Sequence, residues 1–175
     1  MILVLASAVL FGLSVPLAKV LIADVPPVSL AGLLYLGAFL GLTILGFAKV
    51  RDTGKKPALD KKEISWLALV VLFGGVLGPV FLMLGLSQVS GSAASLLLNL
   101  EGVATALIAS AIFHEFTGRR FWIALACMTA AGLFLSWNPE GSGFSLTGPI
   151  FIVLAMFFWG LDNNFTRKIT SIEPV

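Results

Sequence analysis

Long apolar runs alternate with short polar segments along the whole chain. Residues 2–22, 28–48, 64–86, 92–113, 121–137 and 148–166 form six runs that contain few charged residues. Each run is close to the roughly 20 residues that a helix needs to cross about 30 Å of hydrocarbon. The runs are apolar on all sides, whereas membrane-spanning strands alternate polar and apolar residues over about ten positions. The pattern therefore predicts an all-α membrane protein with six transmembrane helices.

The composition agrees with a chain that is solvated by lipid. Of its 175 residues, 58% are hydrophobic and 11% are charged, and the mean hydropathy is +1.03. A water-soluble core of this size cannot hide so much apolar surface. The net charge of +2 gives no indication of a nucleic-acid partner, and the single cysteine, Cys127, excludes an intrachain disulfide.

The basic residues predict how the chain is oriented. They follow the second, fourth and sixth runs at Lys49, Arg51, Lys55, Lys56, Lys61, Lys62, Arg119, Arg120, Arg167 and Lys168. The segments after the first, third and fifth runs contain no basic residue. Because positive charge concentrates on the cytoplasmic side, we expect a multi-pass protein of the cell (inner) membrane with a cytoplasmic N-terminus. Lys19 is the exception, and it lies close enough to the outer end of the first run to extend its amine to the interface.

An internal repeat relates the start of the chain to its end. Residues 11–28 align with residues from 159 onward, pairing Phe11 with Trp159, Gly12 with Gly160, Leu13 with Leu161, Lys19 with Arg167 and Pro26 with Pro174. An odd number of spans separates the two copies, so the second copy has inverted topology, as in many secondary transporters. We therefore expect residues 1–143 to form one five-helix repeat and residues 144–175 to form the first helix of a second, truncated repeat. A missing second half or a homodimer partner would complete it.

Several segments together resemble a known family of transporters. They are ASAVLFGLSVPLAK and DVPPVSLAGLLYLGAFL at the start, SLLLNLEGVATALIASAIFHE followed by FTGRRFWIA, and the restart FIVLAMFFWGLDNNFTRKI. This set resembles the EamA domain of the drug/metabolite transporter superfamily over essentially the whole chain. The resemblance implies a ten-helix carrier of small metabolites or drugs, with a central pocket between two inverted halves.

Glu101 is the first candidate for a functional residue. It lies near the middle of the run 92–113, where a carboxylate costs about 2.5–3.5 kcal/mol on insertion scales. In the functional interpretation Glu101 lines the cavity and exchanges a proton during transport, or contacts a polar group of the substrate. In the structural interpretation it is protonated or hydrogen-bonded to a neighbouring helix and only fixes the packing.

A second polar group interrupts the last run at Asp162, Asn163 and Asn164. At about 100° per residue, three consecutive positions cover more than half of a helix circumference, so at least one faces protein or water. These residues are candidates for substrate binding. Alternatively, Asp162 neutralises a nearby base such as Arg167 or Lys168.

Asn99 and two prolines complete the candidates. Asn99 lies on a stripe of small residues that is more typical of close helix packing than of a ligand site. Pro16 and Pro79 each remove a backbone donor from a span and free a carbonyl that can bind a substrate or an ion. The alternative for both prolines is a simple kink.

The sequence thus predicts a secondary transporter, an exporter by first hypothesis, that moves small metabolites or drugs across the cytoplasmic membrane. Proton coupling is the first hypothesis for its energy source. A sodium gradient or exchange of substrates fits the same residues. The chain shows no nucleotide-binding loop, no catalytic constellation and no metal-ligand spacing, so we expect no enzyme activity and no cofactor. The expected partners are a small-molecule substrate and the lipid bilayer. The alternative is a non-transporting membrane scaffold or an inactive fragment of a ten-helix carrier.

Overall fold

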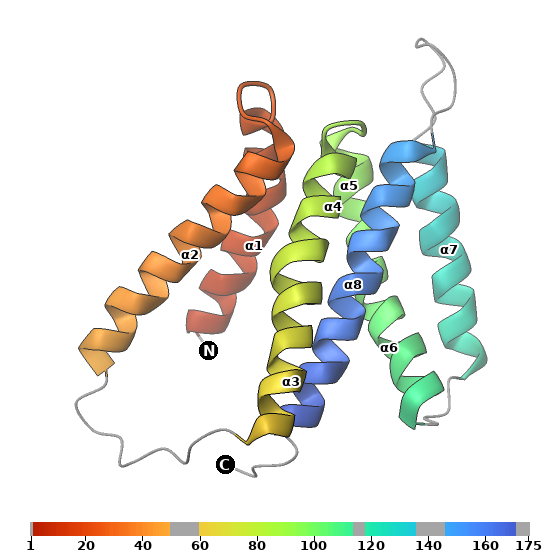
Figure 1. The fold of residues 1–175 in the computed structure, drawn as a ribbon. Helices are drawn as coiled ribbons and strands as arrows, with labels where there is room; N and C mark the ends of the chain where they lie inside the picture. Colours follow the sequence, from red (N-terminus) through yellow and green to blue (C-terminus); the bar gives the residue numbers. More distant parts are fainter. Residues whose placement is uncertain (1, 50–59, 114–117, 136–145, 171–175) are drawn as a thin grey trace.

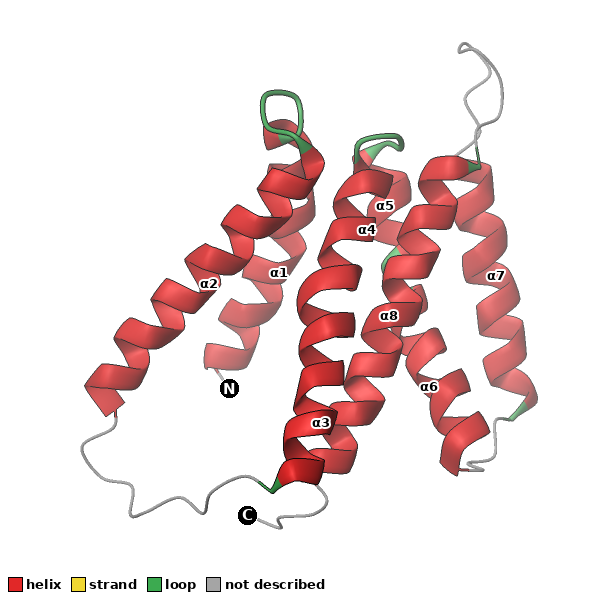
Figure 2. Cartoon of the chain, viewed as in Figure 1, coloured by secondary structure: helices red, strands yellow, loops and turns green. Residues whose placement is uncertain are grey.

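The computed structural model describes residues 2–49, 60–113, 118–135 and 146–170, and the regular structure in these ranges is helical. The elements are α1 (Ile2–Leu21), α2 (Pro27–Lys49), α3 (Lys61–Val70), the π-helix η2 (Val71–Leu77), α4 (Gly78–Leu86), α5 (Gly91–Leu97), α6 (Leu100–Phe113), α7 (Arg119–Leu135) and α8 (Thr147–Thr170). The elements α3, η2 and α4 form one continuous rod, and α5 and α6 form another with a break in it (Figure 1, Figure 2). The described chain therefore runs up and down as six long helices, which confirms the predicted all-α class.

Five of these six helices are long and apolar enough to cross a membrane. The crossing segments are Val4–Leu21, Pro27–Gly46, Glu63–Leu86, Gly91–Ile112 and Thr147–Ile169. The remaining helix, α7, has 17 residues, and the end of its predicted span, with Trp137, lies outside the described residues. Crossing by α7 therefore stays a prediction, as does the repeat boundary at residues 143 and 144, which also lies outside them.

The helix α8 is the centre of the bundle. It packs along the rod of α3, η2 and α4 on one side and along α6 on the other (Figure 1). Ile152, Ala155 and Met156 of α8 are at most 1% exposed. They lie in the same apolar cluster as Leu82 and Leu86 of α4. Most of the helix-to-helix packing in the described part of the chain therefore involves α8.

Glycines allow these helices to approach closely. A Cβ atom added to Gly85 would lie 2.6 Å from Ile152 Cγ1 and 2.8 Å from the backbone oxygen of Gly148. A Cβ atom added to Gly160 would lie 3.0 Å from the backbone of Ala104. The hydrophobic effect contributes little to the association of helices in lipid. Small residues at the crossings let the backbones approach, and the close van der Waals contact that results stabilises the helix pair.

Aromatic rings line the seam between the third span and α8. Trp66, Phe73 and Phe81 alternate along the seam with Phe151, Phe158 and Phe165, and neighbouring ring centroids lie 5.3–5.9 Å apart. The rings of α8 recur every seven residues, which returns to nearly the same face of an α-helix. In the third span the second interval is eight residues long, because the wider turns of η2 take up one extra residue. The π-helix thus keeps Phe81 in register with α8.

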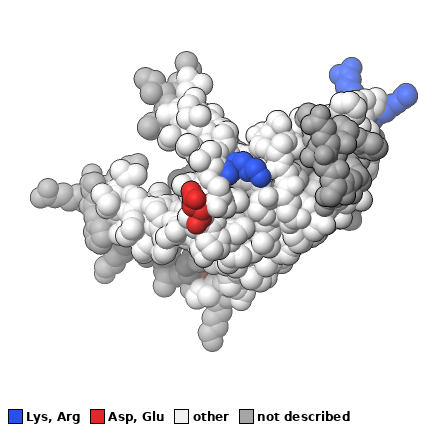
Figure 3. All heavy atoms as spheres, turned by 90° about the horizontal axis from the view of Figure 1, so that it is seen from above, with Lys and Arg blue, Asp and Glu red and all other residues white. Residues whose placement is uncertain are grey.

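The pair α1 and α2 makes far fewer contacts with the rest of the bundle. Among the side chains of α1 and α2 that the structure describes, four are buried: Val15, Ala18, Leu30 and Ala31. All four lie toward the end where the two helices join. Lys19 Nζ donates a hydrogen bond of 2.6 Å to the backbone oxygen of Leu86, at the end of α4. A lysine amine at a helix C-terminus also interacts favourably with the helix dipole. Among the residues that the structure describes, few other charged side chains lie at the end of the bundle where α1 joins α2 (Figure 3).

Replacing Gly85 with alanine should destabilise the bundle, because the added methyl group meets backbone atoms of α8 that cannot rotate away. We expect the free energy of unfolding to fall by about 1–3 kcal/mol, measured by denaturant titration in detergent with circular dichroism. Gly41→Ala is the matched control, since nothing lies within 4 Å of a Cβ atom there. Equal stability of the two variants would contradict the close crossing of α4 and α8.

Candidate functional site

The third span departs from α-helical geometry next to Pro79. The backbone N–H of Gly78 donates to the oxygen of Phe73, five residues earlier, as expected in a π-helix. The oxygen of Gly74 therefore loses its α-helical donor. Its π-helical donor would come from Pro79, which has no N–H. One backbone carbonyl in the middle of a membrane span is thus left without a partner in its own helix.

Two side chains from other helices satisfy this carbonyl. The hydroxyl of Tyr35, on α2, donates to the oxygen of Gly74 at 3.0 Å, and the indole Nε1 of Trp159, on α8, donates to the same oxygen at 3.1 Å. A side chain at Gly74 would overlap the carboxylate of Asp162, and one at Gly78 would overlap the indole of Trp159. The π-helix therefore joins three helices at one acceptor. Side chains of the protein itself bind this carbonyl beside Pro79, and a role of Pro79 in binding a substrate or an ion stays a prediction.

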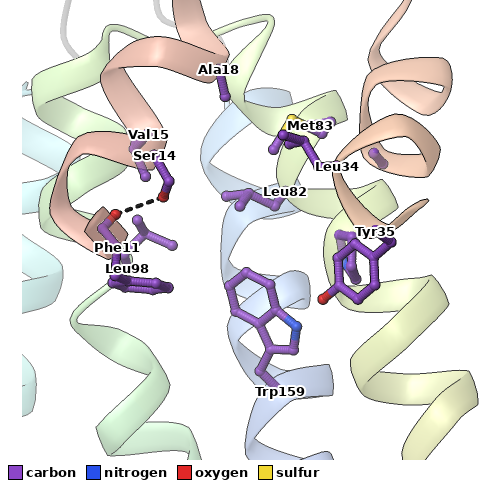
Figure 4. A pocket seen from close by; sticks show the side chains of 12 residues that line it. Phe11, Ser14, Val15, Ala18, Leu34, Tyr35, Leu82, Met83, Leu98 and Trp159 are labelled. Carbon is purple, nitrogen blue, oxygen red and sulfur yellow. Dashed lines mark hydrogen bonds between the residues drawn. The ribbon is translucent and has the colours of Figure 1, made fainter. Parts of the chain in front are cut away.

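An apolar cavity of about 180 Å³ lies beside this junction. Its walls come from α1, α2, α4 and α8 and from the break between α5 and α6, and they include Phe11, Ser14, Tyr35, Pro79, Met83 and Trp159 (Figure 4). No charged side chain is among its lining residues. The hydroxyl of Ser14 donates to the oxygen of Phe11 at 2.6 Å, within α1. The cavity is therefore walled mainly by hydrocarbon and aromatic rings.

The fourth span is broken, whereas the sequence predicted a continuous helix. Between α5 and α6, the backbone N–H of Asn99 donates to the oxygen of Leu96, and the N–H of Glu101 donates to the oxygen of Leu98. The side-chain amide of Asn99 donates to the oxygens of Ser95 and Leu96 at 3.2 Å each. Asn99 thus caps the end of α5 and also lines a small second cavity beside Phe11. Its hydrogen bonds are local. The stripe of small residues on which it lies is largely exposed in the described part of the chain, and nothing lies within 4 Å of a Cβ atom at Gly102, so the expected close packing is not seen there.

The break places Glu101 in the first turn of α6. A carboxylate is stabilised there by the helix dipole, which the sequence analysis did not consider. The amide Nδ2 of Asn163, on α8, donates to Glu101 Oε1 at 3.0 Å and lies 3.2 Å from Thr105 Oγ1. Glu101 is partly buried and Asn163 is exposed at the surface of this chain. Two candidates from distant parts of the sequence therefore meet between α6 and α8.

The neighbours of Asn163 point to different helices. Asn164 is 2% exposed, and its amide donates to the oxygen of Thr105 at 3.0 Å and to the oxygen of Gly160 at 2.8 Å. Asp162 lies against Gly74 of the third span, and it accepts a hydrogen bond of 3.3 Å from the hydroxyl of Thr166. The three residues cover roughly 200° of the circumference of α8. They can therefore contact two neighbouring helices at once: Asp162 contacts the third span, whereas Asn163 and Asn164 contact α6. Asn164 thus links α8 to the backbone of α6.

Pro16 lies apart from the other candidates. It lies inside α1 and is exposed on the surface of that helix. It does not line the cavities described above. Both interpretations of Pro16, a freed carbonyl and a simple kink, stay predictions.

Comparison with known proteins identifies the family. A model of the EamA-like transporter family matches residues 1–137. The chain belongs to the EamA-like transporter family. A protein of Methanothermobacter thermautotrophicus named as an uncharacterized transporter is 24% identical over 177 residues, which cover 94% of this chain and 52% of that protein. This chain therefore spans about half the length of that relative, and no solved structure matches it.

The family result confirms the resemblance read from the sequence, and it assigns this EamA-family chain to membrane transporters rather than to enzymes. Three site residues were missed by the sequence analysis: Tyr35, Thr105 and Trp159. Tyr35 is the only tyrosine of the chain and lies in the middle of an apolar span, which was a usable signal. Thr105 gave no such signal, because a lone threonine bonds readily within its own helix.

Removing both donors to the Gly74 carbonyl should lower the free energy of unfolding by more than the sum of the two single substitutions. In Tyr35→Phe or Trp159→Phe the carbonyl keeps one donor, so we expect each to lower the free energy of unfolding by about 0.5–1.5 kcal/mol. The double variant leaves a buried carbonyl unpaired, which should add about 1 kcal/mol or more. Denaturant titration in detergent measures all three. Thr43→Val is the control, since its hydroxyl bonds only within α2, and strict additivity would contradict a shared acceptor.

Proposed function

We propose that this chain forms the membrane core of a secondary transporter for small metabolites or drugs, and that Glu101 couples transport to protons. The observation that carries this proposal is the hydrogen bond from Asn163 to Glu101 across α6 and α8. An ionisable group inside a membrane span that contacts a second helix is typical of proton relays in transporters. Family membership supports the transport part of the proposal.

The contact can connect proton binding to helix movement. A hydrogen bond to an ionised carboxylate is roughly twice as strong as one between neutral groups. Protonation of Glu101 would therefore weaken its attachment to Asn163, and release of the proton would restore it. Because α8 also packs against the third span, a shift of α8 relative to α6 would change the walls of the apolar cavity. A sodium gradient or substrate exchange remains the alternative energy source.

The charge pattern and the repeat extend the proposal to the whole transporter. We place the N-terminus in the cytoplasm, because Arg119 and Arg120 begin α7 and Arg167 and Lys168 end α8 at the same end of the bundle. We further propose that α8 opens a second repeat of inverted topology, which a second half or a second copy would complete. Export is the expected direction of transport.

Glu101→Gln should abolish proton-coupled flux without lowering the amount of protein in the membrane. The assay is proton movement into proteoliposomes, followed with an internal pH dye, when a panel of small neutral and charged metabolites is added outside. We expect at least a tenfold loss, because glutamine keeps the size and the acceptor oxygen but cannot release a proton. Asp24→Asn is the matched control, since Asp24 is exposed in the turn between α1 and α2. Undiminished proton movement in Glu101→Gln would contradict coupling through Glu101. No proton movement in the wild type with any metabolite of the panel would favour a non-transporting scaffold.

The orientation can be tested with single cysteines in a Cys127→Ala background. Ser87→Cys, after α4, should react with a membrane-impermeant maleimide added to intact cells, because this turn is expected to face outward. Gly118→Cys, before α7, should react only after the membrane is permeabilised. Both positions are exposed in the structure. The reverse labelling pattern would show that the N-terminus faces outward.

A further inference from the structure

We infer that the apolar cavity beside the Gly74 junction binds a small, uncharged aromatic molecule that carries one hydrogen-bond donor. This inference rests on the proposed transport function and specifies its class of substrate. It depends on the size of the cavity, on the hydrogen-bonding capacity of its walls, and on the arrangement of its aromatic rings.

The size of the cavity restricts the ligand to about one or two rings. Its volume is about 180 Å³, and an apolar cavity of about 150 Å³ in a protein core is enough to hold benzene. A sugar nucleotide or a peptide would not fit between these walls. Phe11, Tyr35 and Trp159 approach the space from three different helices (Figure 4), and flat rings pack favourably against such side chains.

The polar groups in the walls accept hydrogen bonds but do not offer any free donor. The hydroxyl hydrogens of Ser14 and Tyr35 and the indole hydrogen of Trp159 are already directed to backbone oxygens. The hydroxyl oxygens of Ser14 and Tyr35 retain lone pairs that can accept a hydrogen bond. A ligand with a hydroxyl or amine hydrogen therefore finds a partner, whereas a ligand that only accepts hydrogen bonds does not.

The absence of charge in the walls selects against ions. The carboxylates of Glu101 and Asp162 do not line this cavity, so a bound ammonium group would lose its hydration without gaining an ion pair. A carboxylate would lose its hydration without meeting a basic side chain. Burial of an unpaired ion is strongly unfavourable. The cavity therefore discriminates in favour of neutral molecules.

The same helix carries the cavity and the proposed coupling group. Trp159 and Asn163 are one turn apart on α8, so their side chains lie on neighbouring parts of one face. Trp159 walls the cavity, and Asn163 holds Glu101. A ring that packs against Trp159 and a proton that binds Glu101 would thus act on the position of the same helix.

Binding can be measured with four related probes by fluorine NMR on the purified full chain in detergent. The probes are 4-fluorobenzyl alcohol, 4-fluorotoluene, 4-fluorobenzoate and 4-fluorobenzylammonium. We expect the alcohol to bind best and both ions to bind at least tenfold more weakly. Tyr35→Phe should lower the affinity for 4-fluorobenzyl alcohol by about two- to tenfold relative to the affinity for 4-fluorotoluene. This is the range expected for the loss of one hydrogen bond.

Two filling variants show where the probes bind. Ser14→Phe adds a ring at the wall of the cavity from an exposed position, so it should compete with the alcohol and remove its binding. Leu107→Phe fills a separate apolar cavity of about 250 Å³ between α6, α7 and α8, so it should leave binding unchanged. Equal signals in the wild type and Ser14→Phe would show that the probes enter only the micelle, and would overturn the inference. Ions that bind as well as the alcohol would overturn it too.

Glu101→Gln separates this inference from the proposed function. The variant should lose proton movement but keep binding of 4-fluorobenzyl alcohol, because Glu101 does not line the cavity. Binding without proton coupling in the wild type would refute the coupling proposal alone. Proton coupling without binding of any neutral probe would refute the substrate class alone.

Discussion

The structure depends on one requirement of the hydrocarbon environment: each backbone polar group needs a partner within the protein. Pro79 cannot donate, and the π-helical turn before it redirects the N–H of Gly78 to Phe73. The oxygen of Gly74 is left to side chains from α2 and α8. This single acceptor places Tyr35 and Trp159 next to each other, and it positions two walls of the apolar cavity.

The same π-helix also keeps the aromatic seam in register. Without its extra residue, Phe81 would rotate away from α8, and the contacts of Phe81 with Phe151 and Phe158 would be lost. A local departure from α-helical geometry thus serves two purposes: it frees an acceptor, and it maintains the packing of a long span. π-Helical turns within α-helices frequently occur at functional sites, which agrees with the position of the cavity.

The helix α8 connects the two parts of the proposed mechanism. Its polar residues, which interrupt an otherwise apolar helix, contact the third span through Asp162 and α6 through Asn163 and Asn164. These contacts explain how three consecutive polar residues can be accommodated in a membrane. The break before α6 contributes equally, because it places Glu101 at a helix N-terminus where a carboxylate is tolerated.

The sequence by itself determined the helical class, five of the membrane spans and the family, because span length and apolar composition are local properties that lipid enforces directly. It also identified Glu101, Asn163 and Pro79 as residues that need an explanation, since each is costly inside a membrane helix. Only the tertiary structure decided their partners. The break at Asn99, the meeting of Glu101 with Asn163, and the pairing of Tyr35 and Trp159 on one carbonyl all depend on contacts between helices that are far apart in the chain. Such contacts leave no periodic signal in a single sequence.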